Sequence, residues 1–109
     1  MAINSVWVFA QVTNGAATTG TLELLTKARS LSSNVTAVLG GDASGVAAQL
    51  GEYGATKVYA TGDLAGKLPG VAVSGAMKAI IDGGDKPDLI LFPQNYEGRD
   101  VLSRLSVKL

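Results

Sequence analysis

The chain has no cysteine and no histidine among its 109 residues. Disulfide bonds are therefore excluded, and so is any zinc site built from cysteine or histidine ligands. Thiol redox chemistry is excluded as well, so any electrons that the protein handles must be carried by a bound cofactor. The acidic side chains are dispersed over predicted turns and helix surfaces. We therefore expect no catalytic residue and no metal site, and the protein is predicted not to be an enzyme.

An excess of charge of either sign is also missing. Nine basic and nine acidic residues give a net charge of zero, and no basic stripe exists to neutralise phosphates, so a nucleic-acid partner is not expected. No segment approaches the roughly 20 apolar residues that cross a bilayer. The first apolar run has no preceding lysine or arginine, which is unlike a signal peptide. We expect no membrane insertion and a cytoplasmic location.

What the sequence does have is four short apolar segments with the composition of buried strands. The first of them is continuously apolar rather than alternating, which is typical of a parallel strand covered on both faces. The segments are residues 5–12, 34–41, 56–61 and 87–94. In the first of them Trp7 and Phe9 share one face, and we interpret both as core residues rather than as cofactor contacts.

Amphipathic segments with helical spacing follow each strand. Thr18 or Thr19 is expected to cap the first helix, and Gly54 to end the second. Pro69 lies near the start of the third helix and Gly83 near its end. The predicted inward-facing positions are Leu22, Leu25, Ala28 and Leu31 in the first helix, Val46, Ala47 and Leu50 in the second, and Val101, Leu102, Leu105 and Leu109 in the last, which is expected to begin after Gly98.

The alternation of strands and helices predicts one α/β domain over residues 1–109. Its expected architecture is three-layer α/β/α with a parallel sheet, because right-handed crossovers place helices on both faces. We predict the strand order 3-2-1-4. The first and fourth strands are the most apolar, so both should be central. The fourth strand then needs a neighbour that these residues do not supply: either a fifth strand is missing from this segment, or another chain covers that side.

Ligands of such sheets bind outside the carboxyl ends of the strands, where the strand order reverses. In the order 3-2-1-4 this crevice lies between loops 12–18 and 94–100. A predicted crevice or interface loop therefore contains Gln94, Asn95, Gly98, Arg99 and Asp100. Its side chains and the following helix N-terminus are suited to an anion or a partner chain. The alternative is that Gly98 only permits the turn and Asp100 caps or charges the first helical turn.

Three further motifs have simpler explanations. The segment "TTGT" (residues 18–21) is similar to the phosphate loop of flavodoxins, but it does not follow the strand directly, and a helix cap explains its threonines. The glycine-rich segments "GGDASG" and "TGDLAG" fit neither nucleotide-binding fingerprint, and we interpret them as turns. A receiver domain needs an acidic pair after the first strand, where Gln11 and Val12 stand.

Across its length the chain resembles the N-terminal part of the electron transfer flavoprotein alpha subunit. The stretches that carry the resemblance are "VWVFAQ", "GTLELLTKARSL", "VTAVLGG", "LGEYGATKVYATGD" and "ILFPQNYEGRDVLSRLSVKL". The last combines an apolar strand end and a polar loop with Gly98-Arg99-Asp100 and a helix that contains Arg104 and Leu105. One departure is Gln11-Val12, where the family often has Glu-His.

The resemblance implies a heterodimeric electron carrier between flavin dehydrogenases and a quinone reductase or other acceptor. It implies a beta-subunit partner, and FAD held by a C-terminal domain that is absent here. This segment, which covers about the first third of the subunit, would have an adenine-nucleotide-hydrolase-like fold, continue into a fifth strand, and bind no cofactor alone. Its task would be scaffolding and subunit contact. The alternatives are a universal-stress-like module that binds AMP or ATP, and an FMN-binding flavodoxin-like protein.

Overall fold

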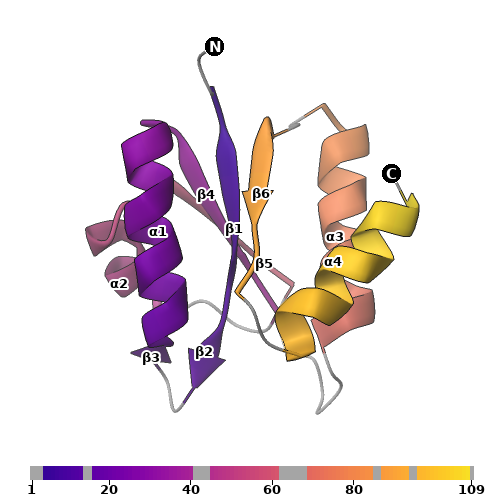
Figure 1. Cartoon of the computed structure of the whole chain (residues 1–109), viewed down its shortest axis with the longest axis horizontal. Coiled ribbons are helices and arrows are strands. Elements are labelled where there is room, and N and C mark those ends of the chain that lie inside the picture. Colours follow the sequence, from indigo (N-terminus) through magenta and orange to yellow (C-terminus); the bar gives the residue numbers. More distant parts are fainter. Residues whose placement is uncertain are drawn as a thin grey trace.

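The four apolar segments form a single parallel sheet (Figure 1). The computed structural model describes residues 4–13, 16–40, 45–61, 69–84, 87–93 and 96–108. The strands are β1 (Val6–Ala10), β4 (Val35–Leu39), β5 (Lys57–Ala60) and β6 (Leu89–Leu91), in the spatial order β5-β4-β1-β6. Counted along the four predicted strands this order is 3-2-1-4, so the predicted topology is confirmed.

Strand β1 lies between β4 and β6 and contributes to both halves of the core. Val6 is aligned with Val35 on one side and with Leu89 on the other. Because successive side chains point to opposite faces of a sheet, Val6 enters one hydrophobic cluster while Trp7 and Phe9 enter the other. All five residues of β1 are buried. The assignment of Trp7 and Phe9 to the core is therefore confirmed.

Two helices cover each face of the sheet, as predicted for three layers. Helices α1 (Thr19–Leu31) and α2 (Ala47–Glu52) pack on the Val6 face, and α3 (Pro69–Asp82) and α4 (Tyr96–Lys108) pack together on the Trp7 face. The buried helix residues in the two clusters are Leu25, Ala28 and Leu50 on the first face, and Val73, Met77, Val101 and Leu105 on the second. Burial of these apolar faces is the main stabilising contribution to such a fold.

Residues expected from the sequence define most of the helix ends. Thr18 caps α1, because its side chain accepts a hydrogen bond from the backbone N–H of Thr21. Gly54 follows α2 with φ of 122°, a conformation that favours glycine. After α3 it is Gly84, with φ of 111°, that adopts the left-handed conformation, one residue beyond the predicted Gly83.

Two positions predicted to face inward are exposed. Ala47 begins α2 at the surface, and Leu102 of α4 has 45 % of its area accessible. Leu102 follows the fully buried Val101, and one step along a helix turns a side chain by about 100°, which takes Leu102 off the buried face. The predicted inward residue Leu109 lies outside the described residues.

The sheet ends at β6. Within the described residues β6 pairs only with β1, and its three residues are half-buried, whereas all five residues of β1 are buried. An apolar edge strand of the kind expected from the sequence is therefore present. After β1 the chain also forms two short antiparallel strands of two residues each, β2 (Val12–Thr13) and β3 (Ala16–Ala17). This pair of strands was not predicted from the sequence.

Candidate functional site

The carboxyl end of β1 is tied to the start of α1 by threonine hydroxyls. The backbone N–H of Gln11 donates to Thr21 Oγ1 at 2.8 Å, and the backbone N–H of Thr18 donates to the Gln11 carbonyl at 3.0 Å. The two threonine hydroxyls are 2.9 Å apart and hydrogen-bonded to one another. Thr21 is fully buried. These hydroxyls therefore join a strand to a helix, and the interpretation of "TTGT" as a helix cap is confirmed.

The same region is fixed from a second side. The backbone N–H of Ala17 donates to Gln49 Oε1 at 3.0 Å, which connects β3 to α2. The wall of the predicted crevice on the β1 side is thus a hydrogen-bonded part of the scaffold.

The predicted loop on the β6 side is only partly described. Gln94 and Asn95 lie outside the described residues. Gly98 is buried within α4, which begins at Tyr96 rather than after Gly98, and Arg99 is exposed. Asp100 accepts a hydrogen bond from Arg104 Nε at 2.9 Å, in an ion pair one helical turn long. The expected capping role of Asp100 is therefore wrong, because Asp100 lies four residues past the start of the helix.

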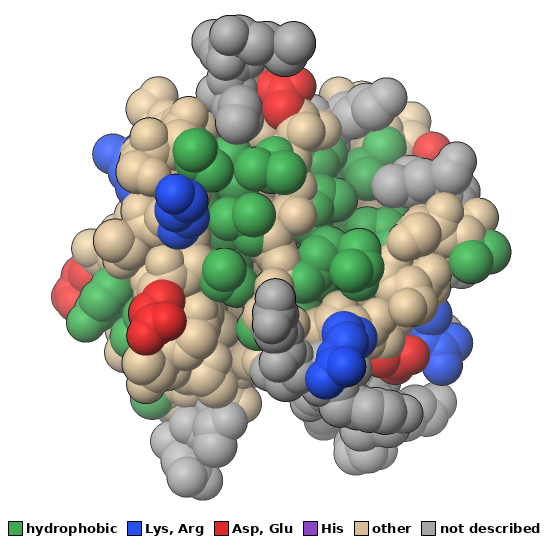
Figure 2. All heavy atoms as spheres, in the orientation of Figure 1, with side chains coloured by type: hydrophobic (Ala, Val, Ile, Leu, Met, Phe, Trp, Pro, Cys, Tyr) green, Lys and Arg blue, Asp and Glu red, His purple; other side chains and the backbone are tan. Residues whose placement is uncertain are grey.

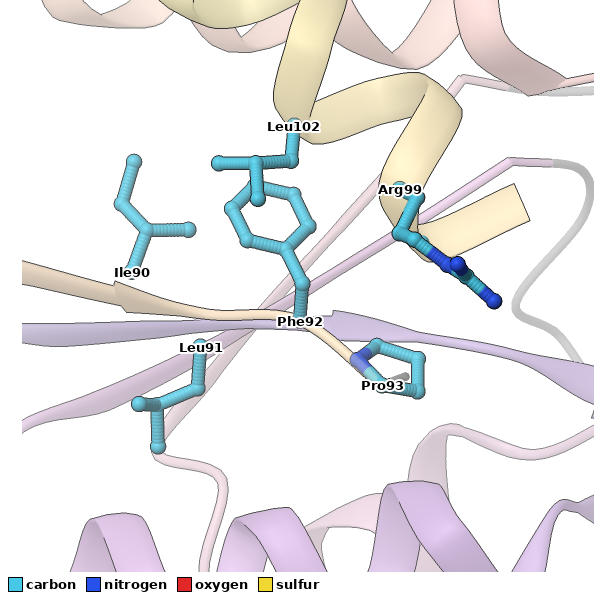
Figure 3. Close-up of a pocket in the computed structure, with 7 residues that line it drawn as sticks. Ile90, Leu91, Phe92, Pro93, Arg99 and Leu102 are labelled. Atoms are coloured by element: carbon cyan, nitrogen blue, oxygen red, sulfur yellow. The ribbon is translucent and has the colours of Figure 1, made fainter. Parts of the chain in front are cut away.

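Gly98 and Arg99 line an open groove of about 270 Å³ beside β6 (Figure 3). The residues that line the groove are Ile90, Leu91, Phe92, Pro93, Gly98, Arg99 and Leu102. In Figure 3, Leu102 and Phe92 point toward one another, Leu91 lies on the opposite side of the strand, and Arg99 extends past Pro93. The groove therefore lies along β6. Its described lining is apolar except for the guanidinium of Arg99 near one end.

This groove does not coincide with the crevice expected between β1 and β6. None of its lining residues comes from β1 or from residues 12–18. Its apolar lining fits an extended apolar segment better than a small polar ligand, since the described lining residues offer one cation and five aliphatic or aromatic side chains. Leu102 was missed as a surface residue because helical spacing alone assigned it to the core.

Figure 2 shows the same feature from outside. Apolar side chains gather in a strip across the face of the molecule that lies over β6, between α1 on one side and α4 on the other. Half-buried residues from both clusters belong to this region, among them Leu89 and Leu91 from one and Ile90 and Phe92 from the other. Apolar strips of this kind on a folded domain are typical of surfaces that bind a ligand, a membrane or another polypeptide.

Two other classes of site were sought in the described ranges. No group of three or more acidic, histidine or cysteine residues there has the arrangement of a metal site. None of the described helices combines the length and hydropathy that are needed to span a bilayer.

Comparison with known proteins agrees with the fold. The sequence pattern of the electron transfer flavoprotein domain matches residues 6–109, which includes every strand and helix described above. The chain belongs to the electron transfer flavoprotein family.

A curated relative defines the type of subunit. The chain is 35 % identical over 106 residues to the electron transfer flavoprotein subunit alpha of Syntrophomonas wolfei subsp. wolfei, an alignment that covers 94 % of this chain. The expectation of an alpha-subunit N-terminal domain of this family is therefore confirmed. The alignment covers 33 % of the relative, so the chain spans about one third of that protein's length.

Proposed function

We propose that this domain is the scaffold and subunit-contact part of a heterodimeric, FAD-containing electron carrier. The carrier would accept electrons from flavin dehydrogenases and pass them to a quinone reductase or another acceptor. The observation that carries the proposal is the match to the family along residues 6–109 together with the similarity to an alpha subunit. The domain acts as an electron-carrier component rather than as an enzyme, in the cytoplasm.

The architecture supports a scaffolding role. The centre of the sheet is filled by apolar side chains, and the hydroxyls at the carboxyl end of β1 bond to the backbone. Rigid layers of this kind hold surface loops in fixed positions. The start of α4, with Arg99 exposed beside the β6 groove, is the surface that we assign to contact with the beta subunit.

We place FAD in a C-terminal domain of the longer subunit, beyond the residues of this chain. The chain spans one third of its alpha-subunit relative, which leaves ample sequence in such a protein for a flavin-binding domain. In that longer subunit a fifth strand would lie against the free edge of β6. The 109-residue chain alone is accordingly expected to be colourless, and a bound flavin spectrum in the purified chain would contradict this placement.

A binding measurement with a purified beta subunit of this family tests the proposal. We expect the 109-residue chain to form a 1:1 complex, and Arg99→Glu to weaken it by about tenfold or more, because charged residues at an interface contribute to orientation and affinity. Lys27→Glu is the matched control, since Lys27 is equally exposed on α1, in the opposite layer. Absence of any complex with the unsubstituted chain would overturn the proposal.

A thermal-shift titration with AMP and ATP separates this function from that of a small-nucleotide module. A ligand at about a hundred times its dissociation constant adds about 2.7 kcal/mol to the free energy of unfolding. We expect no such stabilisation. A clear shift with either nucleotide would instead favour the module.

A further inference from the structure

We draw no further inference here: the strongest candidate, the apolar groove along β6 that Phe92, Leu102 and Arg99 line, belongs to the surface already assigned to the beta subunit, and nothing in the described residues shows what else covers it.

Discussion

The two outer strands of the sheet differ in how they meet solvent. On β5, Lys57 is exposed, and its ammonium lies 5.4 Å from the centroid of the Tyr59 ring and 3.3 Å from the Tyr59 hydroxyl. On β6 all three residues are leucine or isoleucine, and each is half-buried. Charged residues on an outer strand discourage pairing with another chain, while an uncharged apolar edge invites it.

The difference indicates which edge is the natural end of the sheet. The backbone N–H of Thr61 donates to the Leu39 carbonyl, so by alternation Lys57 and Tyr59 also direct their backbone groups toward β4, and Val58 and Ala60 direct theirs outward. On β6 the register with β1 leaves the backbone groups of Ile90 outward. The edge of β5 carries a cation and a phenol beside its outward groups, and the edge of β6 carries aliphatic side chains. We infer that β5 closes the sheet, and that β6 occupies a position that in a complete assembly has neighbours on both sides.

The largest expected loss of stability comes from a comparison of one phenylalanine at the centre of the sheet with one at its apolar edge. Phe9 of β1 is 1 % exposed, and its ring lies 6.2 Å from that of Phe92, which follows β6 and is half-buried. Phe9→Ala should lower the free energy of unfolding by about 3–5 kcal/mol. Phe92→Ala should cost only about 1–2 kcal/mol, because part of its area is already in water. Urea denaturation followed by Trp7 fluorescence gives both values.

Equal losses for the two phenylalanines would contradict this contrast. They would mean that Phe92 is already as well covered as Phe9 in solution. In that case another polypeptide segment would have to cover the edge under the conditions of the measurement.

A smaller loss of stability is expected from substitutions in the two turns that precede the edge strands. Gly54 precedes β5 with φ of 122°, and an added Cβ there would overlap the side chain of Arg29; Gly84 precedes β6 with φ of 111° and has open space around it. Gly54→Ala should cost about 2 kcal/mol of unfolding free energy from strain and displacement of Arg29, and Gly84→Ala about 1 kcal/mol from strain alone. Thermal unfolding compares them, and a greater loss at Gly84 would be inconsistent with these turn conformations.

Most of the fold was predictable because local signals and burial agree. The continuous apolar run of β1 indicated a strand covered on both faces, and the order of the sheet followed from right-handed crossovers. Thr18 and Gly54 were predictable as helix ends because capping chemistry depends on few residue types. The β2–β3 hairpin was not, since each of its strands has only two residues and carries no periodic pattern.

The candidate site was harder to predict from the sequence than the fold. The topological rule indicated the segment that contains Arg99, which is the first turn of α4 rather than a loop, but the groove beside it depends on how α4 packs next to β6. Leu102 illustrates the reason: its spacing fits the buried face as well as Leu105 does, and only the packed structure leaves it at the rim of the groove. Helical periodicity reports which residues share a stripe, and the width of the buried stripe is set by the neighbouring elements.

The substitution with the smallest expected effect on stability replaces the charged residue of β5 and so makes the two edge strands alike. Lys57→Val should alter the free energy of unfolding by only about 0.5 kcal/mol, because Lys57 is exposed. It should nevertheless change association, since β5 would acquire an apolar edge like that of β6. Sedimentation velocity and light scattering should therefore detect a greater average mass than that of the unsubstituted chain.

Lys27→Val is the matched control for Lys57→Val, because it removes the same charge from the exposed surface of α1, away from either edge. Its association should resemble that of the unsubstituted chain. If both lysine variants formed the same species, the positive charge of Lys57 would not be what prevents association through β5. The accessibility of the outward backbone N–H and C=O groups, rather than side-chain charge, would then distinguish the two edge strands.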